Sequence, residues 1–225
     1  YAVRKSGAGN LTISAGTLTG SSDYAVLMEG TGNTTISGGT IKSNATHSVG
    51  FAETTTGTVT IQGTATIQAP ATDAYGIILN GSGNAEFKGT ASITGKNGIS
   101  VARTSGTLTL SAGTITVDGT GISHNSAMNV TASGTTITGG TRGIGSWSSG
   151  SGAISVTSGS ISASTAQGIY SEGSGAISVS GGSVSSTSSS GISAQGANNV
   201  DITISGSAQI TGGTHGISLG NTSMA

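Results

Sequence analysis

Cysteine is absent from this chain of 225 residues, and proline occurs once. No disulfide bond can therefore hold the fold together. In a repetitive extracellular chain, the lack of cysteine suits a protein that is exported unfolded, because a premature disulfide would block its passage. A Ser/Thr/Gly-rich repeat that never acquired cysteine is an equally good explanation.

Charge is scarce as well. Charged residues make up 7% of the chain and the net charge is −1, which excludes the basic footprint of a nucleic-acid-binding protein and a basic membrane-binding patch. No apolar run approaches the length of about 18 residues that a membrane-spanning helix needs. We therefore expect no nucleic-acid partner and no membrane insertion by this segment. Tyr1 does not begin a signal peptide, so we expect a mature protein or an excised fragment.

Glycine is abundant, with 41 residues, and aromatic residues make up only 3%. Without any period, such a composition would indicate a disordered linker. The chain does have a period. Residues 10–25, NLTISAGTLTGSSDYA, return almost unchanged as residues 33–49, NTTISGGTIKSNATHSV, and the rest of the chain consists of further copies.

Each copy contains three short runs in which apolar and polar residues alternate, the pattern of half-buried strands. The inward residues of the middle run are Ile13, Ile36, Ile61, Phe87, Leu110, Val130, Val156, Val179 and Ile204. Those of the next run are Leu18, Ile41, Ile67, Ile93, Ile115, Ile137, Ile161, Val184 and Ile210. Those of the third run are Val3, Val26, Val49, Ile77, Ile99, Ile122, Ile144, Ile169, Ile192 and Ile217. Three ladders that keep step indicate a solenoid whose coils bury apolar residues only by stacking.

The predicted fold is all-β: a right-handed, three-faced parallel β-helix of about nine to ten coils, with roughly 22–26 residues per coil. A left-handed hexapeptide helix would have about 18 residues per coil, and the calcium-binding nonapeptide motif is missing. We expect residues 1–225 to form one segment of this helix. Its first and last copies begin and stop inside a run, so we expect a longer solenoid, or ends covered by a partner.

Three local features give further expectations. A glycine precedes the inward Ile of the third run at Gly98, Gly121, Gly143, Gly168, Gly191 and Gly216; it permits either a positive φ or a close backbone approach. Glu86 and Lys88 are outward neighbours that either meet charges on adjacent coils or are solvated. His124 has inward parity and is expected to be a hydrogen-bonded, partly buried histidine.

Residues 153–173, AISVTSGSISASTAQGIYSEG, and 107–125, TLTLSAGTITVDGTGISHN, resemble the passenger domains of bacterial autotransporters, in particular the pertactin-like passengers. The resemblance covers essentially the whole chain, but many bacterial surface β-helices share this coil. It implies a Gram-negative cell surface and an adhesive or self-associating role. The chain contains no RGD tripeptide and no GDSGS-type protease motif, so only the adhesive scaffold carries over.

Some parallel β-helices cleave polysaccharides, which requires carboxylates, or a carboxylate with Arg or Lys, within several ångströms on one face. Asp23, Asp73 and Asp118 share a corner of the repeat but lie two coils apart in each case, about 10 Å. The histidines are scattered, and a metal site needs clustered ligands. We therefore expect no catalytic residue, no metal site and no cofactor.

Polar residues nevertheless gather at the corner before the third run, about one per coil, and offer a candidate binding edge. They are Asp23, His47, Asp73, Lys96, Asp118, Arg142, Gln167 and His215. The alternative is that charges simply collect at exposed corners. Trp147, the one tryptophan, is expected to be exposed in a long corner and, with Tyr170 of the next coil, to contact a sugar ring.

Hydroxyl ladders follow two outer faces. On the middle run they include Thr12, Thr35, Thr60 and Thr109; on the next run they include Thr17, Thr40, Thr66 and Thr114. Such arrays can bind one another with little repulsion. The chain is thus expected to be a non-enzymatic secreted or bacterial cell-surface adhesin stalk, whose partners are like rods or a host surface protein or glycan. The alternatives are an ice-binding or polysaccharide-binding solenoid and a polysaccharide-cleaving enzyme; Ser and Thr also simply suit exposed strands.

Overall fold

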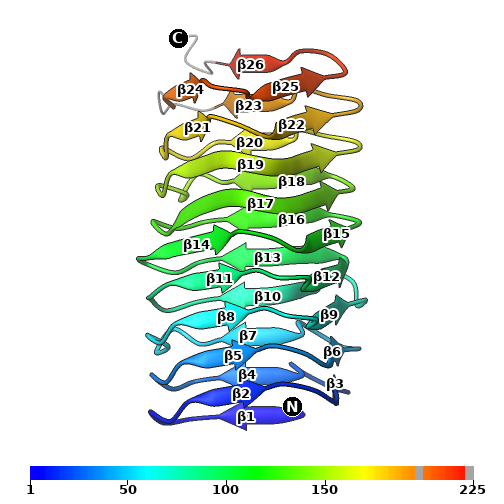
Figure 1. Ribbon diagram of the computed structural model, residues 1–225, viewed down its shortest axis with the longest axis vertical. Helices are drawn as coiled ribbons and strands as arrows, with labels where there is room; N and C mark the ends of the chain where they lie inside the picture. Colours follow the sequence, from blue (N-terminus) through cyan, green and yellow to red (C-terminus); the bar gives the residue numbers. More distant parts are fainter. Residues whose placement is uncertain (196–199, 221–225) are drawn as a thin grey trace.

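The strands of this protein are too short to bury an apolar face alone, and the computed structural model shows how stacking solves this. It describes residues 1–195 and 200–220, which contain strands and no helix, and so no helix able to cross a membrane. About nine turns of chain stack into a parallel β-solenoid, with the N-terminal coil at one end and the C-terminal coil at the other (Figure 1). The predicted fold class is confirmed.

Three strand series make up the wall. The first face contains β1 (Val3–Lys5), β4 (Val26–Met28), β7 (Val49–Phe51), β10 (Tyr75–Leu79), β13 (Asn97–Val101), β16 (Thr120–His124), β18 (Arg142–Ser146), β20 (Ile169–Ser171), β23 (Ile192–Gln195) and β26 (Ile217–Gly220). The second face contains β2 (Leu11–Ile13), β5 (Thr34–Ile36), β8 (Val59–Ile61), β11 (Ala85–Phe87), β14 (Thr107–Leu110), the first part of β17 (Asn129–Gly139), the first part of β19 (Ile154–Ala163), β21 (Ile177–Val179) and β24 (Ile202–Ile204). The third face contains β3 (Thr17–Gly20), β6 (Thr40–Ser43), β9 (Thr66–Ala69), β12 (Ser92–Gly95), β15 (Thr114–Val117), the last parts of β17 and β19, β22 (Ser183–Ser186) and β25 (Gln209–Gly212).

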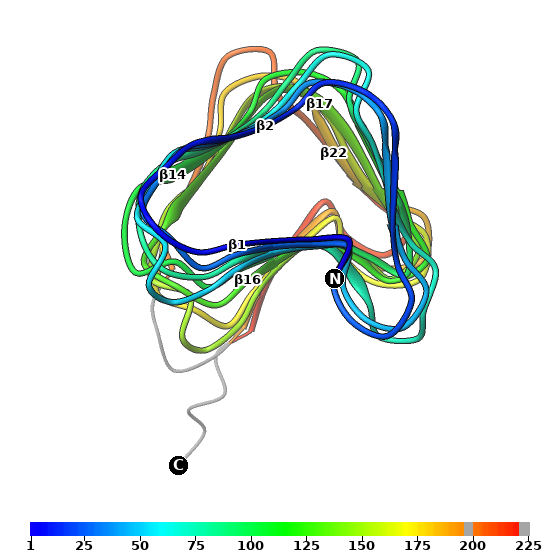
Figure 2. The same ribbon diagram turned by 90° about the horizontal axis from the view of Figure 1, so that it is seen from below.

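The three faces form a triangular cross-section, seen along the axis in Figure 2. From the N-terminus the chain runs clockwise through β1, β2 and β3 while it moves away from the viewer (Figure 2). The solenoid is therefore right-handed, as predicted. We call the turn from the first to the second face the first corner, the turn from the second to the third face the second corner, and the turn from the third to the first face the third corner.

The inward ladders form the core. On the first face Val3, Val26 and Val49 pair in register, and the column continues without a break to Ile217. The predicted third-face ladder, Leu18 to Ile210, is likewise in register throughout. Most of these side chains are fully buried, so the apolar core runs continuously along the axis.

One member of the second-face ladder was predicted wrongly. Leu110 pairs with Ala132, and Ala132 with Val156, whereas Val130 pairs with Leu108 and Ile154. Val130 and Ala132 both point inward from the same strand. Val130 was assigned to the ladder because its side chain is larger and more apolar. The pairing through Ala132 is the one that keeps the coils in register.

The second corner changes character in the middle of the rod. In β17 and β19 the strand continues around it, and the pairing between them has register shifts near Ser133. In the outer coils a short turn separates the second-face and third-face strands instead. The second and third faces are consequently joined into a single 16-stranded sheet, while the first face is a separate 10-stranded sheet.

The repeated glycine of the third corner is explained by close approach rather than by positive φ. Neither Gly121 nor Gly143 has a positive φ. A Cβ atom at Gly121 would overlap Cγ2 of Ile137 and would lie 2.6 Å from the carbonyl oxygen of Gly143. Glycine thus lets the strand of the first face start against the third-face core column.

Asparagine side chains link successive coils at the first corner. The Oδ1 atom of Asn10 accepts the backbone N–H of Asn33 at 2.9 Å, and Asn33 Oδ1 accepts that of Thr58 at 2.9 Å. Asn84 and Asn129 do the same for the coils above them. These amides supply acceptors where the strand ladder is interrupted, which keeps the corner backbone hydrogen-bonded.

Candidate functional site: the outer faces and the third corner

The third face presents two outward columns two residues apart on each strand. The first contains Thr17, Thr40, Thr66, Ser92, Thr114, Thr136, Ser160, Ser183 and Gln209. The second contains Thr19, Lys42, Gln68, Thr94, Thr116, Thr138, Ser162, Ser185 and Thr211. Lys42 is the one charged side chain among these positions. We call these two columns the hydroxyl face.

The geometry of the hydroxyl face follows from that of the sheet. Neighbours along a column are about 4.8 Å apart and the two columns are about 7 Å apart. Some neighbours hydrogen-bond to each other: the Ser183 hydroxyl lies 3.1 Å from that of Ser160, and the Ser162 hydroxyl donates to Thr138 at 3.3 Å. The result is a regular, almost uncharged array of hydroxyl groups.

The second face carries one outward column. Thr12, Thr35 and Thr60 pair in register, as predicted, and Thr109 continues the column one coil beyond Glu86. The carboxylate of Glu86 is 2.6 Å from Nζ of Lys88, the residue that follows β11. The two charges therefore pair with each other rather than with adjacent coils, and Glu86 interrupts the hydroxyl column.

At the third corner the predicted polar residues do not form one line. Two register pairs define one column: Tyr75 pairs with Asn97 and Thr120 pairs with Arg142, and Asn97 lies opposite Thr120 because Ile99 pairs with Ile122. His47 belongs to the same column as Tyr75, since Val49 pairs with Ile77. Asp23 and Lys96 precede this column by one residue, while Asp73 and Asp118 precede it by two. The corner therefore holds three adjacent columns of mixed chemistry.

The N-terminal half of this corner is an aromatic stack. The ring centroids of Tyr1 and Tyr24 are 6.4 Å apart, those of Tyr24 and His47 5.5 Å, and those of His47 and Tyr75 5.8 Å. Burial lowers the pKa of His47. Burial opposes the charge on Asp23, but hydrogen bonds from the Tyr24 N–H and from the Tyr1 and Thr46 side chains lower the pKa of Asp23 on balance. This stack holds the corner of four successive coils in place.

Further along the corner, Asp73, Lys96 and Asp118 line one shallow depression with Thr72, Asn97 and Gly119. Nζ of Lys96 is 2.8 Å from Oδ2 of Asp118, and this hydrogen bond raises the pKa of Lys96. Asp73 has a positive φ of 59°, which places it in the left-handed region. The structure thus brings together two carboxylates and an ammonium that the sequence placed on one corner but separated by coils.

Trp147, Tyr170 and Arg142 form a second cluster. The indole and phenol rings are 5.7 Å apart and edge-to-face, and the Arg142 guanidinium carbon is 5.0 Å from the Trp147 centroid and 4.6 Å from that of Tyr170. Trp147 Nε1 donates to the Ser123 hydroxyl at 3.0 Å. Tyr170 is only 8% exposed, its hydroxyl donates to Glu172, and burial raises its pKa. Arg142 covers part of both rings, which leaves little aromatic surface for a sugar.

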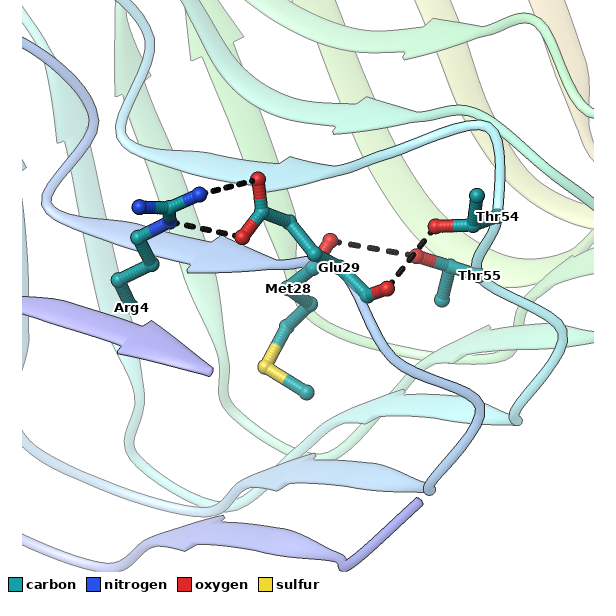
Figure 3. Close-up of polar contacts among 5 residues, drawn as sticks. All are labelled: Arg4, Met28, Glu29, Thr54 and Thr55. Atoms are coloured by element: carbon teal, nitrogen blue, oxygen red, sulfur yellow. Dashed lines mark hydrogen bonds and ion pairs between the residues drawn. The ribbon is translucent and has the colours of Figure 1, made fainter. Parts of the chain in front are cut away.

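Around the N-terminal first corner the polar groups are used for stacking (Figure 3). Arg4 pairs with both carboxylate oxygens of Glu29, at 2.7 and 3.1 Å. The Thr54 hydroxyl donates to the Glu29 carbonyl at 2.9 Å, and the Thr55 hydroxyl to the Met28 carbonyl at 3.2 Å. Among the residues that the structure describes, no group of three or more His, Asp or Glu side chains is placed to hold a metal ion.

Of two interior polar groups, the sequence analysis predicted His124 and missed Arg103. His124 has the predicted inward position but is fully buried: Nε2 lies 2.7 Å from the Met128 carbonyl and Nδ1 lies 3.1 Å from the Ser146 hydroxyl. Arg103 is also fully buried. Its inward parity, two residues after Val101, was the one signal in the sequence that pointed there.

Comparisons with known proteins identify no relative. No protein-family model matches the chain, and no curated protein or solved structure matches it either.

Proposed function

We propose that this chain is a non-enzymatic adhesin stalk that associates side by side with like rods through the hydroxyl face. The observation that carries the proposal is the in-register pair of hydroxyl columns on the third face, with Lys42 as its one charge. The flat faces of two neighbouring rods can approach without electrostatic repulsion when both faces are uncharged. Hydroxyl groups, which both donate and accept, can then hydrogen-bond across the contact.

The hydroxyl face suits this role better than the second face does. The second face has a single outward column, and Glu86, which is paired with Lys88, breaks it. A paired charge must be desolvated when two surfaces meet, and that cost offsets much of the gain from contact. We therefore assign self-association to the third face and leave Thr12, Thr35, Thr60 and Thr109 as secondary contacts.

We propose that the chain acts outside the cell. The resemblance of residues 107–125 and 153–173 to autotransporter passengers supports a secreted or bacterial cell-surface location and a role in attachment. The third corner is the place where a host surface protein or glycan would be recognised, because side-chain chemistry there varies from coil to coil.

The depression lined by Asp73, Lys96 and Asp118 favours attachment over catalysis. A general base works best with a pKa near the operating pH, whereas the bond to Asp118 raises the pKa of Lys96 and keeps it a cation. A fixed ion pair beside a second carboxylate can bind polar groups of a ligand. An assay for release of unsaturated or reducing sugar ends from uronic-acid polymers would reveal cleavage, and turnover would contradict the non-enzymatic proposal.

Ice binding is a second candidate, and one observation favours it. Thr114, Thr116, Thr136 and Thr138 form a rectangle of hydroxyl and methyl groups on adjacent coils, at spacings of about 4.8 and 7 Å. Such a flat, regular patch can order water. Thermal hysteresis measured on the purified chain separates the two candidates, because an adhesive stalk gives none.

The proposal is tested by sedimentation velocity over a concentration series, with lysine substitutions on the hydroxyl face. Association that these substitutions abolish supports the proposal. A chain that stays monomeric at all concentrations contradicts it.

A further inference from the structure

Arg103 occupies an unusual place for an arginine. It follows β13 at the first corner, at a position where the neighbouring coils have Gly81 and Ser126, and its side chain is 0% exposed. The Thr104 N–H donates to the Gly81 carbonyl at 2.8 Å, which fixes the register of this corner. The side chain therefore lies inside the solenoid rather than on its surface.

The guanidinium is only half satisfied. Nη1 donates to the carbonyl oxygens of Gly57 at 3.3 Å and Asn84 at 3.2 Å, and the guanidinium carbon lies 5.7 Å from the centroid of the Phe51 ring. Nε and Nη2 have no acceptor among the described protein groups. No carboxylate in residues 1–195 or 200–220 forms an ion pair with it.

A second unsatisfied group lies near the same corner. The buried Thr34 hydroxyl also lacks a hydrogen-bond partner among the described residues. Thr34 pairs with Val59, which lies two residues after the Gly57 carbonyl that Arg103 contacts. The corner between β7 and β8 spans residues 52–58, which is longer than the corners at residues 29–33 and 80–84.

Leaving a buried cation unpaired is costly. Burial lowers the pKa of Arg103 to about 10, so the side chain still carries its charge at neutral pH. Nε–H and Nη2–H lie on one edge of the guanidinium and point the same way, the arrangement that binds an anion through two hydrogen bonds. The Phe51 ring, which the guanidinium faces, supplies no competing negative charge.

We propose that the Nε–Nη2 edge of Arg103 is an internal binding site for a small inorganic anion of the halide class, with chloride as the physiological candidate. The anion accepts both guanidinium N–H bonds and neutralises the buried charge. Because Arg103 is fully buried, a bound anion must be small, which disfavours carboxylate and phosphate ligands. The anion would act as a structural ligand of coils three to five.

Two measurements test this. In crystals grown in sodium bromide, the anomalous signal of bromide should lie within hydrogen-bonding distance of Nε and Nη2 of Arg103. In solution, the thermal midpoint should be about 2–4 °C higher in sodium chloride than in sodium gluconate at equal ionic strength, since a ligand that binds only the folded state stabilises it. Arg103→Met should abolish the chloride-specific rise, whereas the exposed control Arg4→Met should keep it.

Equal midpoints in chloride and gluconate for the unsubstituted chain, together with no bromide at Arg103, would overturn the proposal. So would a chloride-specific rise that survives in Arg103→Met. If that variant does not fold, the bromide crystals of the unsubstituted chain decide the matter alone, because bromide either lies at the guanidinium edge or does not.

Discussion

His47 accepts a hydrogen bond through Nδ1 from the backbone N–H of Tyr75, at 2.9 Å. The acceptor nitrogen must be unprotonated, so the imidazole is neutral in the folded stack between Tyr24 and Tyr75. His124, buried inside the solenoid, is held neutral because burial disfavours the charged ring and lowers its pKa. Two histidines on different parts of the fold therefore resist protonation.

The stability of the fold should consequently depend on pH. Burial depresses the folded-state pKa of both histidines below the unfolded value of about 6.5. Above that value both states are neutral and nothing is lost. As the pH falls through it, the unfolded state binds protons first, so the free energy of unfolding should decrease by up to about 1.4 kcal/mol per pH unit for each histidine.

Urea unfolding between pH 7.5 and 5 measures this dependence. The double variant His47→Gln, His124→Gln should show a clearly flatter profile over the same range, even if its absolute stability is lower. An unchanged slope in the double variant would assign the pH dependence to other groups.

Trp147 offers a fluorescence probe, since it is the one tryptophan. Arg142 covers its ring, and Ser123 accepts the indole N–H. Arg142→Ala should therefore shift the emission maximum to longer wavelength and increase quenching by acrylamide, because the ring gains contact with water. Lys42→Ala, on a different face, serves as the control. Emission that does not change in Arg142→Ala would mean that the guanidinium does not shield the indole.

Gly121 should not tolerate a side chain. A Cβ atom there meets Ile137 and the Gly143 carbonyl, and overpacking of this kind costs about 1–3 kcal/mol. Gly9→Ala is the matched control, since a Cβ at Gly9 meets only the end of the Lys5 side chain, at 3.8 Å. Chemical unfolding of both variants checks the prediction, which fails if Gly121→Ala is as stable as the control.

Each corner asparagine should stabilise the fold through the single hydrogen bond that its side chain accepts from the next coil. Asn84→Ala leaves the Thr107 N–H without its acceptor at 3.0 Å, and we expect a loss of about 0.5–1.5 kcal/mol. Asn84→Asp keeps an acceptor oxygen and should recover most of this loss. If the alanine and aspartate variants unfold at the same denaturant concentration, the amide has no such role.

Periodicity predicted most of the fold, because stacking of identical coils ties register directly to sequence spacing. The ladders from Val3 to Ile217 and from Leu18 to Ile210 are in register as predicted. The error at Val130 arose where two inward residues compete and the smaller one, Ala132, belongs to the ladder. The alternation of a strand shows which face a residue lies on. It does not show which of two residues on that face pairs with the ladder residue of the next coil.

The candidate sites were less predictable, for two reasons. Corners vary in length, so Asp23, Asp73 and Asp118 could be assigned to a corner but not to a column within it. Side-chain pairing at long range also has no signature in a single sequence: the contacts of Arg142 with Tyr170, and of Arg103 with Gly57, span many residues. The second hydroxyl column, from Thr19 to Thr211, did have a signal in the alternation of each strand.

The most direct test of the account is sedimentation velocity over a concentration series for four proteins. They are the unsubstituted chain, a hydroxyl-face variant (Thr17→Lys, Thr94→Lys, Thr136→Lys), a second-face variant (Thr12→Lys, Thr60→Lys, Thr109→Lys) and a corner control of equal charge (Ser105→Lys, Ser149→Lys, Thr187→Lys). The substituted positions within each variant avoid directly neighbouring coils in a column, so that the lysines do not repel one another within the fold. Circular dichroism confirms that each variant keeps its strands.

The account predicts that the unsubstituted chain, the second-face variant and the corner control associate as concentration rises, whereas the hydroxyl-face variant stays monomeric. Association of the hydroxyl-face variant to the same extent as the corner control, or a monomeric unsubstituted chain, would contradict it.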